Sequence, residues 1–210
     1  MHQGNRSIVY IDGFNLYYGA VRGGPHKWLD LQKYFTLLRQ GDDLRRIYYF
    51  TAIIQGSRRS NQETYLRALE KLPLVEIRLG KFKNKTITCG VPTCTHAGRK
   101  RFEVPEEKQT DVAIGIQMLE DAFENRSDRF VIVSGDSDLL PAVHAIKRLF
   151  PPKKIIVYVP SRSPQRGAAI ELRSAADQDR TLPLRLLKVS QFPPQVPDGH
   201  GGWICKPPSW

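Results

Sequence analysis

The chain of 210 residues lacks any apolar run close to the roughly 20 residues that a membrane-spanning helix needs. Its first residues, MHQGNRSIVYIDG, do not show the basic, apolar and small-residue order of a secretory signal peptide. Cysteine is scarce as well, because three cysteines are an odd number and do not make the disulfide framework of a small secreted domain. These absences predict a cytoplasmic protein.

Acidic residues are outnumbered, and this imbalance is the strongest bias in the composition. Lys and Arg number 32 against 21 Asp and Glu, which gives a formal net charge of +11. Such a surplus favours a polyanionic partner, with nucleic acid ahead of an anionic membrane surface. The alternative is a basic surface that only aids solubility.

Apolar runs that are rich in β-branched residues alternate with helical patterns along the chain. Buried strands are predicted at residues 7–11, 45–54, 129–134 and 153–159. Helices are predicted at residues 28–41, 58–71, 110–124 and 138–150. This alternation predicts an α/β fold of three layers, with a central, mostly parallel sheet flanked by helices.

Three segments of the predicted fold carry further expectations. Residues 74–82 alternate apolar and polar side chains, as expected of a half-exposed or edge strand. The helix at 110–124 is expected to turn one apolar face inward, made by Val112, Ile116, Leu119 and Phe123. We place one domain at residues 1–190, with an irregular basic insert at about 83–105. A Pro/Gly-rich tail at 191–210 is not expected to form a packed element, although its Trp and Ile side chains could dock on the body.

Carboxylates follow two of the predicted strands. Asp12 ends the first strand in YIDGFN, and Asp136 follows the strand at 129–134 in VSGDSD. Since the carboxyl ends of parallel strands meet at one edge of the sheet, both acids should lie there. Carboxylates that converge repel one another unless protons or cations intervene, and Mg²⁺ or Mn²⁺ prefers such oxygen ligands. A basic protein with this acidic site is a plausible phosphodiester hydrolase.

Each acid also has a purely structural explanation. Asp138 or Ser137 could cap the helix that begins at Leu139, and Asp111 could be a first-turn acid that opposes a helix dipole. Asp12 and Asp136 could belong to tight turns beside glycine. Turn chemistry alone does not readily explain two strand-end acids at one edge of a sheet, which favours the metal site.

Three motifs in this order, YIDGFNLYYG, EEKQTDVAIGIQMLEDAF and VIVSGDSDLLPAV, resemble the NYN domain. This family is a branch of the PIN-like nuclease superfamily, whose stand-alone bacterial members include LabA-like (DUF88) proteins. The resemblance covers about residues 6–160. It implies a PIN-like fold and a metal-dependent ribonuclease that acts on RNA with Mg²⁺ or Mn²⁺, without a membrane partner, and it leaves a homodimer open.

The resemblance also implies roles for single residues. Asp12, Asp111, Asp136 and Asp138 correspond to the metal-binding acids of the family. Asn15 corresponds to a polar neighbour that orients Asp12 or contacts a phosphate, and we include it with the catalytic residues. Two hydroxyl groups, those of Ser134 and Ser137, could donate hydrogen bonds to the carboxylates.

The basic insert offers candidates for RNA binding. Cationic residues there are interleaved with Phe82 and Phe102, a combination that can grip a single strand by charge and stacking. The cationic candidates are Lys83, Arg99, Lys100, Arg101 and Lys108. The alternative is a solvated loop whose Phe side chains tuck into the body.

The same insert contains a candidate zinc site. Cys89, Cys94 and His96 lie close together in TCGVPTCTH, but structural Zn²⁺ takes about four ligands. Cys205 or His200 would have to complete the set. The alternative is reduced thiols without metal, and a bound Zn²⁺ would brace the insert rather than act in catalysis.

Two other functions compete with the ribonuclease. A metal-dependent phosphatase acting on small substrates fits the strand-end acids, although IDGFN lacks the second acid of an Asp-x-Asp motif. A non-catalytic RNA-binding regulatory module would keep the fold without turnover. No Gly-rich Lys-Ser/Thr phosphate loop is present in the sequence, which disfavours a nucleoside triphosphatase.

Overall fold

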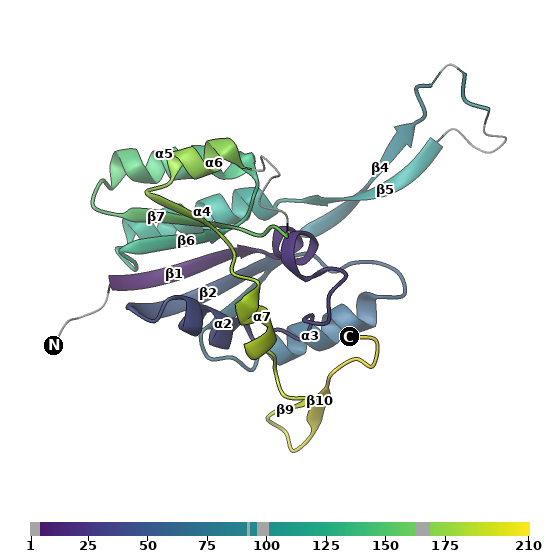
Figure 1. Cartoon of the computed structure of the whole chain (residues 1–210). Helices are drawn as coiled ribbons and strands as arrows, with labels where there is room; N and C mark the ends of the chain where they lie inside the picture. The colour runs from purple at the N-terminus through teal and green to yellow at the C-terminus, as the bar shows by residue number, and fades with distance from the viewer. Residues whose placement is uncertain (1–4, 92, 96–100, 163–168) are drawn as a thin grey trace.

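A computed structural model describes residues 5–91, 93–95, 101–162 and 169–210. Its centre is a six-stranded sheet in which every neighbouring pair is parallel (Figure 1). In spatial order the strands are β3 (Val75–Leu79), β2 (Asp42–Thr51), β1 (Asn5–Asp12), β6 (Arg129–Val133), β7 (Lys154–Val159) and β8 (Gln178–Thr181). The predicted α/β fold with a flanked parallel sheet is confirmed.

Helices cover both faces of this sheet. One face carries α1 (Gly13–Leu16), the π-helix η1 (Tyr17–Val21), α2 (Leu31–Leu38), α3 (Arg59–Leu69) and α7 (Arg185–Val189). The other face carries α4 (Thr110–Phe123), the short 3₁₀ helix η2 (Ser137–Leu139), α5 (Leu140–Leu149) and α6 (Ile170–Ala175). Alternate residues of β1 serve the two cores, because successive side chains of a strand point to opposite faces.

The predicted inner face of α4 is wrong for three of its four residues, while Leu119 is half-buried and packs against the core. Val112, Ile116 and Phe123 are exposed, with 66%, 52% and 82% of their surface accessible, while Ile114 and Met118 are fully buried. Apolar residues occur all around this helix, so periodicity alone did not select a face. A buried hydrogen bond identifies the inner face, since the hydroxyl of Tyr10 on β1 donates to Asp121 on α4 at 2.7 Å.

The predicted irregular insert is wrong for the parts that the structure describes. β4 (Lys81–Thr88) and β5 (Arg101–Lys108) pair as an antiparallel hairpin that projects from the body (Figure 1). Most described side chains of this arm are exposed, so no apolar alternation marked its strands in the sequence. The short edge strand β8 was missed for the same reason, because its sequence QDRT is polar.

The segment after residue 190 forms a packed element, which its Pro and Gly content did not predict, and its Ile204 and Trp210 side chains pack against the body. It forms a small hairpin of β9 (Gln195–Pro197) and β10 (Trp203–Cys205). Ile204 is 2% exposed and belongs to the core beneath α2 and α3. The indole of Trp28 donates to the carbonyl oxygen of Pro193 at 2.8 Å. Proline carbonyls remain acceptors, so Pro-rich chain can still be fixed by hydrogen bonds.

Candidate metal centre

The candidate site lies at the carboxyl ends of β1 and β6, in the middle of the sheet. The chain proceeds from β1 toward β2 and β3 on one side, and later fills β6, β7 and β8 on the other. In α/β proteins, ligands bind at the edge of the sheet where the strand order reverses in this way. Asp12 is the last residue of β1, and Asp136 follows β6 by three residues.

Asp12 is buried and held by three donors. The backbone N–H of Asn15 donates to Oδ1 at 2.9 Å, and the side-chain amide of Asn15 donates to Oδ2 at 2.5 Å. The hydroxyl of Ser134 donates to Oδ2 at 3.2 Å. Asn15 also accepts from the N–H of Gly135 at 3.1 Å, so one amide joins the ends of β1 and β6. These contacts fix the carboxylate before any ligand arrives.

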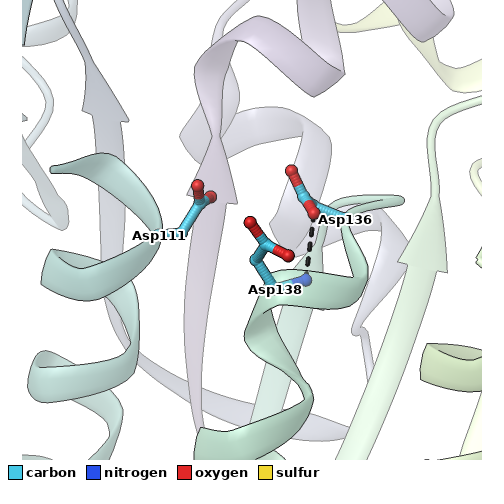
Figure 2. A group of neighbouring side chains, drawn as sticks. All are labelled: Asp111, Asp136 and Asp138. Atoms are coloured by element: carbon cyan, nitrogen blue, oxygen red, sulfur yellow. Dashed lines mark hydrogen bonds between the residues drawn. The ribbon is translucent and has the colours of Figure 1, made fainter. Parts of the chain in front are cut away.

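Asp136 caps the turn that follows β6. Its Oδ1 accepts from the backbone N–H of Asp138 at 3.0 Å, which starts η2 (Figure 2). The sequence alternative in which Asp138 or Ser137 is the cap is therefore wrong. An aspartate two residues before an N–H makes this turn readily, while its second oxygen stays available. Asp138 is exposed and makes no cap.

Three carboxylates converge at this edge (Figure 2). Asp111, Asp136 and Asp138 each offer an oxygen, and these oxygens lie within 4.8 Å of one another. Asp111 belongs to the first turn of α4, which begins after Gln109 in the left-handed conformation at φ 81°. Within the described residues this is the sole group of three or more acids, His or Cys so arranged.

Burial and mutual repulsion raise the pKa of two carboxyl groups at this site. Burial, followed by the charges of Asp136, Asp12 and Asp138, raises the pKa of Asp111 from 3.8 to about 6. Burial also raises the pKa of Asp12, the hydrogen bonds from Asn15 and Ser134 oppose this, and Asp136 raises it again. Several carboxylates whose neighbours disfavour their charge form a site that a divalent cation would relieve.

Glu107 is a further acid of this site that the sequence reasoning missed. Burial, followed by the charges of Asp12 and Asp111, raises its pKa from 4.5 to about 7. Its carboxylate contacts the hydroxyl of Thr110 closely, at the start of α4. Glu107 belongs to β5, so the base of the arm borders the carboxylates. Its position in EEKQTD, one residue before the lysine of the motif, was the available signal, but only the hairpin register shows that it faces inward.

Three of the basic candidates lie on the strands of the arm. Lys83 and Arg101 are exposed on β4 and β5, and Lys108 is exposed at the base of β5. Arg99 and Lys100 lie outside the described residues. Phe82 does not stack in solvent, because its ring meets Phe14 edge to face at 5.5 Å between centroids.

Within the described residues, the proposed zinc ligands do not form a group of three or more that could hold a metal ion. Cys89 and Cys94 are free cysteines near the end of the arm, and His96 lies outside the described residues. Cys205, in β10, is at the opposite end of the molecule from the arm (Figure 1). His200 lies in the loop that joins β9 to β10, so neither residue is placed to complete the site.

No helix in the described ranges is long and apolar enough to cross a membrane.

Comparison with known proteins identifies relatives of the chain. A family model described as NYN domain matches residues 6–183. The 6-hydroxy-3-succinoylpyridine 3-monooxygenase HspA of Pseudomonas putida is 34% identical, over 98% of this chain and 75% of that protein.

A crystal structure of a protein of unknown function from Vibrio parahaemolyticus superimposes with a TM-score of 0.57. The match covers 87% of this chain and 96% of that one, at 19% identity. At this identity the similarity supports the fold alone.

Proposed function

This chain belongs to the NYN domain family of the PIN-like nuclease superfamily, and on that premise we propose that it is a metal-dependent ribonuclease. It would hydrolyse RNA phosphodiester bonds at the carboxyl edge of the sheet. The observation that carries the proposal is the cluster of Asp111, Asp136 and Asp138, with ligand oxygens within 4.8 Å of one another. The buried Asp12 supplies a fourth carboxylate, whose charge raises the pKa of Asp111.

The donor set fits a hard divalent cation. All candidate ligands are carboxylate oxygens, which Mg²⁺ and Mn²⁺ prefer. Zn²⁺ is more often bound by cysteine sulfur and histidine nitrogen. Asp111, Asp136 and Asp138 would hold the ion, with Asp12 beneath them. Bound there, the ion supplies an activated water and neutralises charge on the phosphoryl group.

The chain's own residues supply orientation and proton transfer. Asn15 and Ser134 donate hydrogen bonds to the carboxylate of Asp12 and so hold this side chain in one orientation. Glu107, with a pKa of about 7, exchanges a proton easily near neutral pH, which suits the leaving group or the attacking water. The net charge of +11 and the exposed cations Lys83 and Arg101 would attract the RNA backbone.

A cleavage assay with single substitutions tests the proposal. Asp136→Asn and Asp12→Asn should abolish the cleavage of RNA that Mn²⁺ supports and EDTA stops, while RNA binding is kept. Asp43→Asn is the matched control, because Asp43 is an exposed acid at the other end of β2, paired with Arg45 at 2.6 Å. Unchanged cleavage in both site variants would contradict the assignment.

The same assay separates the two rival functions. Hydrolysis of p-nitrophenyl phosphate, with RNA left intact, would indicate a phosphatase for small substrates. RNA binding without turnover under any divalent cation would indicate a regulatory module.

A second candidate reaction comes from the relative named as a monooxygenase. The observation that favours it is a cavity of about 490 Å³ that is lined by residues of α1 and by aromatic side chains. Gly13, the residue that follows Asp12, also lines this cavity. Oxygen uptake in the presence of 6-hydroxy-3-succinoylpyridine and a two-electron reductant tests it. Uptake that depends on both compounds would support this reaction, and none would leave the ribonuclease as the proposed activity.

A further inference from the structure

A second concave site lies on the sheet face opposite α4. It is a cavity of about 490 Å³ between α1–η1 and α3, closed on one side by the last residues of the chain. Six aromatic residues line it: Phe14, Tyr17, Tyr18, Tyr49, Tyr65 and Trp210. This volume lies within the range of small-molecule sites, which are concave and mostly apolar.

The floor and the rim of the cavity differ in chemistry. Tyr49, Tyr65 and Leu29 form a buried floor, with 7%, 8% and 1% of their surface accessible. The cationic residues Arg22 and Arg58 of the lining are exposed. A ligand would therefore place its apolar part inward and an anionic part at the rim.

Charge complementarity identifies the ligand class. The lining contains three cations, Arg22, Lys27 and Arg58, and no Asp or Glu side chain. In the part of the chain that the structure describes, none of the three forms a salt bridge. Cations beside aromatic rings without acidic partners favour anions that carry a ring.

The walls are held in place by their own hydrogen bonds. The hydroxyl of Tyr65 donates to the carbonyl oxygen of Leu29 at 2.8 Å. Gln62 accepts from the N–H of Ile54 at 2.8 Å, and the amide of Asn61 donates to the hydroxyl of Ser209 at 3.0 Å. A cavity whose lining is fixed beforehand loses less entropy when a ligand binds.

The π-helix η1 shapes one wall. Tyr17, Tyr18 and Val21 all belong to it and all line the cavity. Its wide turn ends with the N–H of Arg22 donating to the carbonyl oxygen of Tyr17 at 2.6 Å, and the guanidinium of Arg22 lies over the ring of Tyr18 at 5.1 Å. Such turns are rare and are frequently found at functional sites.

We propose that this cavity binds a small planar aromatic compound with an anionic group on a short chain. The ring would stack among the tyrosines, and the anion would lie at the rim beside Arg22 and Arg58. Two sources share this chemistry, namely an aromatic carboxylate and a mononucleotide, and we favour the carboxylate because the rings and apolar floor dominate the lining. The inference deepens the second candidate reaction, which uses the same cavity, but it requires neither turnover there nor ribonuclease activity.

Isothermal titration calorimetry of the whole chain in EDTA tests the site without involving the metal centre. The probes are 4-phenylbutyrate, its neutral analogue 4-phenylbutanamide, and uridine 5′-monophosphate. Phenylbutyrate should bind about fivefold more tightly than the amide, which corresponds to about 1 kcal/mol in total from the ion pairs at the exposed rim. Tighter binding by the nucleotide, in competition with phenylbutyrate, would assign the nucleotide as the source.

Two charge-matched double variants locate the binding. Arg22→Gln with Arg58→Gln should abolish the preference for the anion, and both residues are exposed, so the fold should be kept. Arg45→Gln with Arg46→Gln removes the same charge from the far end of β2 and should leave binding unchanged. Equal affinity for phenylbutyrate and the amide, equal binding by both double variants, or no saturable binding up to about 10 mM of any probe would overturn the proposal.

Discussion

Replacing Asp111 with asparagine should stabilise the metal-free protein in alkaline solution. Burial and three neighbouring acids raise the pKa of Asp111 from 3.8 to about 6, so the fold favours its protonated form. A carboxyl group whose pKa is raised by folding lowers stability once it ionises, and this cost appears as pH rises through 3.8 to about 6. Asparagine has no such ionisation and removes the cost.

The size of the effect follows from the shift. A rise from 3.8 to about 6 corresponds to about 3 kcal/mol, since each unit is worth about 1.4 kcal/mol. Solvent screens part of this at a half-buried side chain, and the substitution also removes about 0.5 kcal/mol of favourable interaction with the α4 dipole. A net gain of about 1 kcal/mol is expected near pH 8, falling to about a third of that near pH 4.5.

Urea unfolding in EDTA near both pH values measures this gain. The matched control is Glu120→Gln, because Glu120 is an exposed acid on the same helix, and its variant should change stability little at either pH. Mn²⁺ should raise the unfolding midpoint of the natural chain and not that of Asp111→Asn. A variant that is less stable near pH 8, or that gains equally at both pH values, would refute the electrostatic reasoning.

Three further predictions concern packing and RNA binding. Tyr10→Phe should lower the free energy of unfolding by about 2 kcal/mol in urea titrations, because the fully buried Asp121 loses its 2.7 Å donor, and an unchanged midpoint would contradict this. Gly19→Ala should destabilise by more than about 2 kcal/mol, since its new Cβ would lie 2.1 Å from the backbone oxygen of Pro160; a soluble variant with an unchanged melting temperature would refute that contact. RNA affinity measured by fluorescence anisotropy should fall with salt with a log–log slope of about −0.7 per phosphate contact, and a flat dependence would exclude the basic surface as the RNA-binding site.

The motifs of the candidate site were readable because they combine strand ends with acids. Asp12 and Asp136 follow buried strands, and parallel strands must deliver their ends to one edge. Local chemistry was read less well. Asp136, not Asp138, caps the turn, because the choice depends on the backbone path after Gly135 rather than on residue type.

The arm and the inner face of α4 could not be deduced from pattern. Periodicity reports burial, and the arm buries little of its described surface, so its strands carry no period. On α4 the buried Asp121 accepts a hydrogen bond from the hydroxyl of Tyr10, which lies more than a hundred residues earlier in the chain. A contact at that separation leaves no local trace in the chain.

The sequence by itself determined the alternation of the buried central strands with helices, the acids at the strand ends and the family, because these depend on neighbours along the chain. Tertiary structure alone decided that Glu107 faces the carboxylates and that Trp210 closes a cavity behind α1. Both depend on how distant segments meet: the register of an antiparallel hairpin places the first, and the docking of a proline-rich chain end places the second.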